Sequence, residues 1–165
     1  SCASSAPTPT SSRASAPEPM PAAPRLALIP GEPAGVGPEL CVRVAQRAQP
    51  GRLIAYGDGD TLLSAARALG LPLRLRRVRA DDVDARDAEA SAPGELALVE
   101  HPNAAASRFG HADPANAGSV VGALRAAAAD ALAGRVDGLV TGPVHKAAII
   151  RGGVRFTGVT ELLAE

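Results

Sequence analysis

Residues 25–40, RLALIPGEPAGVGPEL, join a short apolar run to a segment with three glycines and three prolines. The run 25–29 has the length and hydrophobicity of a buried strand, and Pro30 ends it. Proline is tolerated in the first turn of a helix, so Pro38 predicts a helix over residues 38–48. The segment therefore predicts a strand, a rigid loop and a helix, which together form the repeating unit of an α/β fold.

The same order of strand, turn and helix recurs along the chain. Apolar runs bounded by turn residues predict further strands at residues 53–56, 71–78, 95–99 and 136–141. Further helices are predicted over 60–69 with Asp60 as the N-cap, within 115–133, and from about residue 144. Such alternation predicts an α/β architecture, a mostly parallel sheet with flanking helices.

The composition narrows the classes of partner. The 165 residues include 17 acidic and 17 basic side chains, and no basic stripe runs along any segment, which argues against nucleic acid. No segment approaches the roughly 20 apolar residues that a membrane span needs, which argues against a membrane protein. Cys2 and Cys41 lack metal-ligand or redox neighbours, which favours a reduced, cytoplasmic setting.

Residues 1–24 differ from the rest of the chain because Ser, Ala and Pro dominate them and large apolar side chains are almost missing. Such a segment cannot bury enough surface to offset the entropy of ordering. We therefore expect a disordered extension over 1–24 and a folded α/β part over 25–165.

The loop after the first strand is the first candidate site. Its glycines, at 31, 35 and 37, have neither the dinucleotide-binding spacing nor the Walker spacing. The prolines make the path rigid, Gly35 and Gly37 permit close backbone approach, and the following helix N-terminus attracts anions. Glu32 is then a carboxylate held at the carboxyl edge of the sheet, where ligands of open α/β folds bind. The alternative is an ordinary tight connection.

The second candidate is the segment TGPVHK, residues 141–146, where a strand again runs into a helix. Lys146 is the only lysine in the chain, since the other 16 of the 17 Lys and Arg residues are arginine. Either this position needs the compact ammonium of a lysine, or the lysine is kept by chance. A cation at a helix start opposes the helix dipole, which favours a Lys146 that faces an anionic ligand or a carboxylate. The alternative is a solvated Lys146 beside a surface His145, with Thr141 simply ending the strand.

The third candidate is FTGVTE, residues 156–161, in which two hydroxyls and a carboxylate flank a glycine. A phosphate can accept hydrogen bonds from Thr157 and Thr160, although Thr160 can equally be only a helix N-cap. His101 and His111 have no Cys or His partner at metal-ligand spacing, so both are predicted to be solvent-exposed loop residues.

Taken together, PGEPAGVGPEL (30–40), DGLVTGPVHKAAI (137–149) and FTGVTE (156–161) resemble the 4-hydroxythreonine-4-phosphate dehydrogenase family of vitamin B6 biosynthesis. The resemblance implies a fold like isocitrate and isopropylmalate dehydrogenases, with two α/β domains around a cleft, in a homodimer. It implies oxidation of 4-phosphooxy-L-threonine, a small phosphorylated substrate, to an amino-ketone phosphate. NAD or NADP and a divalent metal (Zn, Mg or Co) are the implied cofactors.

The chain departs from the family pattern at two points. The family has histidine where this chain has Val159, although the substrate-binding Thr160 is kept. Losing a hydrogen bond to a charged group costs about 1.5–3 kcal/mol, so substrate binding is expected to weaken. The family's metal-ligating histidines lie beyond the equivalent of Glu165, so we expect a partial fold with no metal ligands and no activity in these residues alone.

Within this resemblance, Thr160 and the Val159 position are expected to face the substrate, with possible support from Glu32, Lys146, His145 and Thr141. Two alternatives stay open. One is a related dehydrogenase of four-carbon phosphorylated acids such as threonate or erythronate phosphates. The other is a non-catalytic α/β module, a pseudoenzyme that binds a phosphorylated ligand or assembles with a partner chain.

Overall fold

The computed structural model describes residues 23–79, 82–83 and 91–164, so the prediction of disorder over 1–24 lies almost wholly outside the described residues. In chain order the elements are β1 (Arg25–Ile29), α1 (Gly37–Ala45), β2 (Arg52–Gly57), α2 (Gly59–Leu69), β3 (Arg74–Arg77), β4 (Glu95–Glu100), the short 3₁₀ helix η2 (Pro114–Asn116), α3 (Ala117–Leu132), β5 (Gly138–Thr141), α4 (Lys146–Arg151) and α5 (Val159–Ala164).

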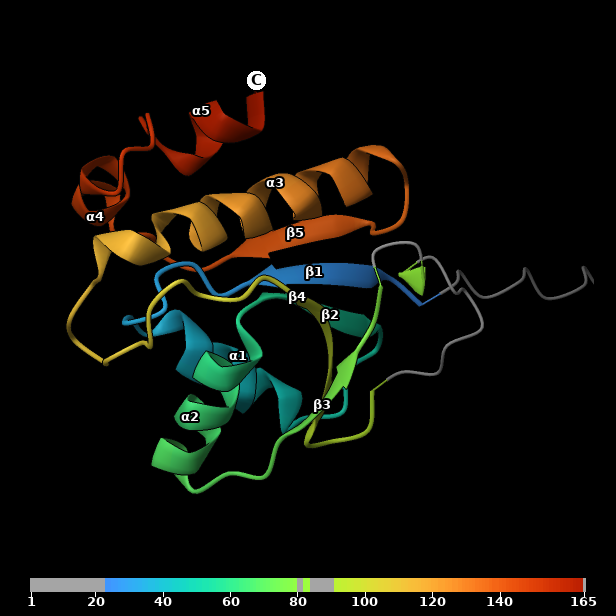
Figure 1. Cartoon of the computed structure of the whole chain (residues 1–165). Helices are drawn as coiled ribbons and strands as arrows, with labels where there is room; N and C mark the ends of the chain where they lie inside the picture. The colour runs from blue at the N-terminus through green and yellow to red at the C-terminus, as the bar shows by residue number, and fades with distance from the viewer. Residues whose placement is uncertain (1–22, 80–81, 84–90, 165) are drawn as a thin grey trace, which may run out of the picture.

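The strands form one sheet in the order β3-β4-β2-β1-β5, and every neighbouring pair is parallel. The predicted α/β architecture is therefore confirmed. Helices α1 and α2 pack together on one face of the sheet, whereas α3 covers the other face and carries α4 and α5 on its far side (Figure 1). Because all strands run in one direction, their carboxyl ends share one edge, and the loops that follow them meet there.

The inner strands β1, β2 and β4 are buried on both faces, whereas the edge strands β3 and β5 are partly exposed. Alternate residues of β1 enter different clusters, since Ala27 and Ile29 join the cluster under α3 while Leu28 joins the cluster under α1. In β2, Ile54 and Tyr56 likewise point to the α3 side. This explains why β1, β2 and β4 read as mostly continuous apolar runs rather than as alternating patterns.

Some predicted boundaries move for identifiable reasons. Helix α2 is capped by Asp58, whose carboxylate accepts from the Thr61 N–H at 2.7 Å, so the prediction of Asp60 as the N-cap is wrong. Strand β3 is shorter than the predicted 71–78. Leu71 still belongs to the end of α2, because its N–H donates to Ala66 O at 3.0 Å. Within the described residues, no helix is long and apolar enough to cross a membrane.

A buried polar contact fixes α3 on the sheet. The Tyr56 hydroxyl donates to Asp130 Oδ2 at 2.5 Å, and Arg135 donates to Asp130 Oδ1 at 2.5 Å. Asp130 is only 3% exposed, so both partners are needed to compensate the burial of its charge. Burial, followed by the hydrogen bond to Asp130, raises the pKa of Tyr56, which keeps its hydroxyl proton on the donor.

We expect Tyr56→Phe to lower the free energy of unfolding by about 1.5–3 kcal/mol, because Asp130 loses a buried hydrogen bond to a charged acceptor. Urea unfolding followed by circular dichroism measures the change. Leu132→Ala, at a side chain that is 91% exposed, serves as the control and should change stability by less than about 0.5 kcal/mol. Equal stability of the Tyr56→Phe variant and the parent protein would contradict the structural role of this contact.

Candidate functional site

The first two sequence motifs are held together at the carboxyl edge of β1 and β5. Ile29 lies beside Thr141 in the parallel register, so the two loops start at the same level. The Gly142 N–H donates to Ile29 O at 2.7 Å, and the Glu32 N–H donates to Pro143 O at 2.9 Å. The β1–α1 loop and the β5–α4 loop therefore form one hydrogen-bonded unit.

Glycine is required in these loops because they contact each other through backbone atoms. A Cβ on Gly37 would lie 1.7 Å from Pro30 O, and a Cβ on Gly142 would lie 2.2 Å from the same oxygen. A Cβ on Gly35 would lie 3.2 Å from Glu32 O. The close backbone approach predicted at Gly35 and Gly37 is thus an approach of the chain to itself, and the alternative of a tight connection describes this part of the loop better than a ligand cradle.

Glu32 is buried in this unit, with only 8% of its surface exposed. Its Oε1 accepts from the Ala34 N–H at 3.1 Å, and its backbone carbonyl accepts from the Gly35 N–H at 3.0 Å. Both contacts lie within the loop, so the carboxylate holds the loop in shape. The described contacts of Glu32 are therefore structural contacts of the β1–α1 loop.

The polar side chains of the β5–α4 segment are exposed, whereas Val144 packs against the main core cluster. Thr141 and Lys146 are exposed. His145 is the N-cap of α4, because its Nδ1 accepts from the Ala148 N–H at 3.0 Å. An Nδ1 that accepts a hydrogen bond leaves the ring proton of the neutral imidazole on Nε2. His145 therefore caps a helix in this structure, and Lys146 is its exposed cationic neighbour.

The third motif leads into α5, which packs on the same far side of α3 as α4 does (Figure 1). Helix α5 begins at Val159, one residue before the predicted alternative N-cap Thr160, so Thr160 lies in the first turn and is exposed. The Val159 side chain is half-buried and packs against the main core cluster. Among the described residues, no hydrogen bond or ion pair joins Thr160 to Glu32 or Lys146, so this motif is connected to the other two through α3.

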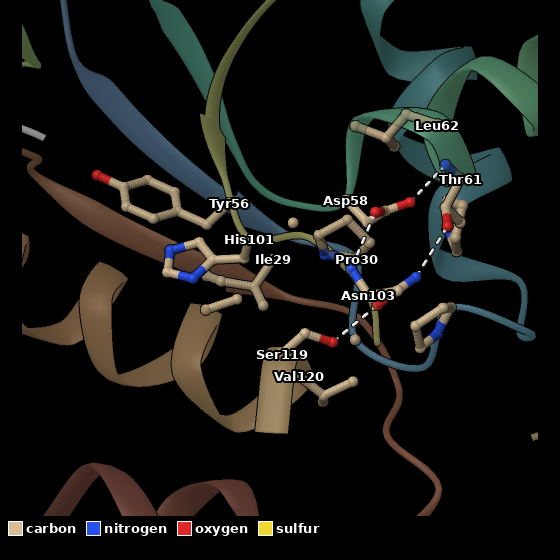
Figure 2. Close-up of a pocket in the computed structure, with 15 residues that line it drawn as sticks. Ile29, Pro30, Tyr56, Asp58, Thr61, Leu62, His101, Asn103, Ser119 and Val120 are labelled. Atoms are coloured by element: carbon tan, nitrogen blue, oxygen red, sulfur yellow. Dashed lines mark hydrogen bonds between the residues drawn. The ribbon is translucent and has the colours of Figure 1, made fainter. Parts of the chain in front are cut away.

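A pocket opens at the same edge of the sheet, between the ends of β2 and β4 (Figure 2). The chain leaves β2 toward α2 on one face and leaves β4 toward α3 on the other, which is the position at which open α/β sheets bind ligands. The lining residues come from β1 and its loop, the start of α1, the β2–α2 connection, the segment after β4, and α3: Ile29, Pro30, Gly31, Pro33, Pro38, Tyr56, Gly57, Asp58, Thr61, Leu62, His101, Asn103, Ser119, Val120 and Ala123. The first candidate loop contributes Pro30, Gly31, Pro33 and Pro38 to this lining, whereas Glu32, Lys146, Thr160 and the other singled-out site residues are not among the lining residues.

Asn103 is the centre of a polar network at the pocket that the sequence analysis missed. Its N–H donates to Asp58 Oδ2 at 3.0 Å, and its Nδ2 donates to Thr61 Oγ1 at 3.0 Å. Its Oδ1 accepts from the Ser119 hydroxyl at 2.7 Å. Figure 2 shows these bonds linking residues from three elements. Asp58 and Asn103 each closely follow a strand, and this placement could have identified them as neighbours.

His101 is not the exposed loop residue that the sequence predicted. Its N–H donates to Gly57 O at 2.8 Å and so extends the pairing of β4 with β2, which turns the ring inward. The ring stacks on Tyr56 with the centroids 6.4 Å apart, and Nε2 is buried without a hydrogen-bond partner. Burial lowers the pKa of His101 below its usual 6.5. The neutral imidazole is therefore part of the packing between β4 and α3.

The described residues do not offer a metal-binding set. Among them, no three His, Cys, Asp or Glu side chains lie together in a way that could hold a metal ion. Cys41 is a free, buried thiol whose pKa is raised to about 12 by burial. A thiol with so high a pKa is neither a reactive nucleophile nor a ready metal ligand.

The fold and the edge loops assign the chain to a fold class, the open, parallel α/β domains of the isocitrate and isopropylmalate dehydrogenase type. A family profile described as "Pyridoxal phosphate biosynthetic protein PdxA" matches residues 49–165. The chain belongs to this family. The resemblance inferred from the three motifs is thereby confirmed.

Individual relatives agree with this assignment. The chain is 59% identical over 143 residues to the 4-hydroxythreonine-4-phosphate dehydrogenase of Xanthomonas axonopodis pv. citri (strain 306), covering 86% of this chain and 42% of that protein. It is 55% identical over 143 residues to the enzyme of the same name from Stenotrophomonas maltophilia (strain R551-3), covering 86% and 41%. The chain thus spans less than half the length of these curated relatives.

Solved structures match over a similar share. The crystal structure of a 4-hydroxythreonine-4-phosphate dehydrogenase from Burkholderia phymatum superposes with a TM-score of 0.75 at 26% identity, covering 86% of this chain and 43% of that one. The structure from Klebsiella pneumoniae gives a TM-score of 0.74 at 26% identity, covering 86% and 44%. The sheet described above therefore matches part of the fold of these family structures.

The contact between the two motif loops predicts a large cost for Gly142→Ala. The new methyl group would have to displace the backbone carbonyl of Pro30, so we expect a loss of about 1–3 kcal/mol in the free energy of unfolding. Gly118→Ala is the matched control, because a Cβ there meets nothing within 4 Å and the position is helical. Chemical denaturation of both variants measures the difference, and a Gly142→Ala variant as stable as the control would refute the contact.

The buried His101 predicts a loss of stability on mild acidification. Its folded-state pKa lies below the usual 6.5, so below that pH the unfolded chain takes up the proton first. Stability is therefore full above about pH 6.5 and falls as the pH drops toward the folded-state pKa, by at most about 1.4 kcal/mol per pH unit. Thermal unfolding between about pH 7.5 and about pH 5 measures this loss of stability. This range spans the pH values at which an ordinary histidine takes up its proton.

His101→Phe is the control for this pH dependence. It keeps an aromatic ring against Tyr56 and removes the titrating group. The difference in melting temperature between the parent protein and this variant should change as the pH falls through this range. A difference that stays constant with pH would show that His101 does not contribute.

Proposed function

We propose that the chain supplies part of a site for the NAD(P)-dependent oxidation of 4-phosphooxy-L-threonine to an amino-ketone phosphate, a step toward pyridoxal phosphate. The observation that carries the proposal is the bond from the Glu32 N–H to Pro143 O at 2.9 Å, because it holds two motif loops at one ligand-binding edge. The relatives named 4-hydroxythreonine-4-phosphate dehydrogenase support the substrate class.

The proposal assigns separate tasks to the chain's own residues. Lys146 is exposed at the start of α4, and its ammonium attracts the phosphate group of the substrate. The exposed hydroxyls of Thr141 and Thr160 donate hydrogen bonds to phosphate or alcohol oxygens. Glu32 and His145 keep the loop and the helix start in place. Remote binding of the phosphate orients the reacting carbon, which is how binding energy contributes to rate.

The family also implies a nicotinamide cofactor, to accept a hydride from the secondary alcohol, and a divalent metal (Zn, Mg or Co), to acidify that alcohol. The glycines of the β1–α1 loop face protein backbone, and the described residues hold no metal-binding set. Neither group fits the described residues by themselves, so no step is derived through them. A homodimer and a cytoplasmic location belong to the same proposal.

Val159 supports a second candidate. Its side chain packs on the core at the position where the family has a substrate-binding histidine. A valine offers no hydrogen bond to a phosphate or hydroxyl. This favours a substrate with a different pattern of hydrogen-bond acceptors, such as another four-carbon phosphorylated acid, or a module that binds a phosphorylated ligand without catalysis.

A chimera tests the function. In it, the matching segment of this chain replaces the corresponding 143 residues of the Xanthomonas axonopodis relative. We expect the chimera to reduce NAD or NADP when 4-phosphooxy-L-threonine is supplied, whereas the 165-residue chain should give no rate above background. The rise in absorbance of the reduced nicotinamide measures the reaction. Val159→His in the chimera should lower KM by about tenfold to a hundredfold, since it restores a charge-assisted hydrogen bond.

Leu132→His is the control for the added imidazole, because that side chain is 91% exposed on α3. It should leave KM unchanged. A folded chimera that shows no turnover, while the relative itself is active, would refute the proposed function. Turnover with a threonate or erythronate phosphate in its place would establish the second candidate.

A further inference from the structure

We propose that Gly152 is a positioning residue for Lys146, because it seats α4 directly on the junction of η2 and α3. The inference rests on the proposed function, in which the Lys146 ammonium binds the substrate phosphate. Gly152 follows α4 immediately and lies outside the three motifs.

Helix α4 is anchored at both ends. At its start, the preceding loop is bonded to the β1–α1 loop through Pro143 O and the Glu32 N–H. At its end, Gly152 lies against the backbone of Pro114 and the methyl group of Ala117. The helix has six residues and is only about 9 Å long. A displacement at one anchor is therefore transmitted to most of the helix.

Close approach, rather than backbone conformation, requires glycine at this position. Gly152 has φ −76° and ψ 8°, which alanine adopts without strain. A Cβ there would nevertheless lie 2.3 Å from Pro114 O and 2.4 Å from Ala117 Cβ. Neither atom can move by a side-chain rotation. The end of α4 would have to shift by about 1 Å to reach ordinary contact distance.

The seat itself is rigid on its other side. Asn116, at the end of η2, accepts from the Ala105 N–H at 2.8 Å through Oδ1. Ser119 in the first turn of α3 donates to Asn103 Oδ1 and to Asn116 O. Because these bonds hold the junction to the segment after β4, a clash at Gly152 moves α4 and not the junction. Misplacement of a binding group by about 1 Å can cost up to about a hundredfold in rate.

Two readouts test the inference. In the chimera, Gly152→Ala should lower kcat/KM by about tenfold to a hundredfold, whereas Gly118→Ala should not, since its added Cβ meets nothing within 4 Å. In the Lys146→Ala background, Gly152→Ala should have almost no further effect, because the two changes remove one interaction. A purely structural role would instead give additive losses.

The second readout does not depend on catalysis. Lys146 is the only lysine in the chain, so amine acylation followed by peptide mass spectrometry reports its side chain alone once the N-terminal peptide is set aside. Inorganic phosphate should protect Lys146 from acylation in the parent chain and in the Gly118→Ala variant. In the Gly152→Ala variant, the phosphate concentration that gives half-maximal protection should be about tenfold higher.

The possible outcomes are distinct. If the chimera has no activity but inorganic phosphate still protects Lys146 of the parent chain from acylation, the proposed function is refuted. The inference is then decided by the protection experiment on Gly152→Ala. Unchanged protection in Gly152→Ala, or additive losses with Lys146→Ala, overturns the inference. If Gly152→Ala does not fold, the double variant Ala117→Gly/Gly152→Ala removes one of the two clashes. Partial recovery of protection then supports the inference, and protection equal to that of the parent protein overturns it.

Discussion

The carbonyl group of Pro30 is enclosed by two glycines that come from different loops. Gly37 approaches it from the start of α1, and Gly142 approaches it from the end of β5. This contact is possible only without a Cβ on either residue, and it brings the two loops close enough for the Gly142 and Glu32 N–H groups to be satisfied. Buried backbone donors need such partners. The relative position of the β1–α1 and β5–α4 loops, and with it the start of α4 at Lys146, depends on this enclosed oxygen.

The sequence predicted the strands and the class of fold well, because β1, β2 and β4 are apolar on both faces and turn residues bound them. It also placed Glu32 on the loop after β1 and Lys146 in the first turn of the helix that follows β5, and both lie there in the structure. It could not predict which atoms the glycines face, since a short contact such as that between Gly37 and Pro30 O depends on the path of the whole loop. Spacing alone describes a cradle and a self-contact equally well.

The misplacement of His101 and the omission of Asn103 have a common physical cause. Both follow β4 in a segment rich in small and polar residues, which a sequence pattern describes as a surface loop. Its course is set by long-range partners instead: Gly57 O for the His101 N–H, and the Asp58 carboxylate for the Asn103 N–H. These partners become neighbours only when β4 inserts between β3 and β2, and strand order is not encoded in local periodicity.

Val159 shows how packing limits the side chains that fit at one position. Its half-buried side chain packs against the apolar cluster that includes Phe156 and Leu162, its near neighbours in sequence, and so helps to hold α5 on α3. An imidazole there would have to keep a polar nitrogen satisfied at the boundary of the core, or lose stability by burying it. Valine removes that cost and removes a hydrogen-bond donor together. The choice of residue at position 159 is therefore coupled to the stability of α5, because this side chain belongs to the packing that holds α5 on α3.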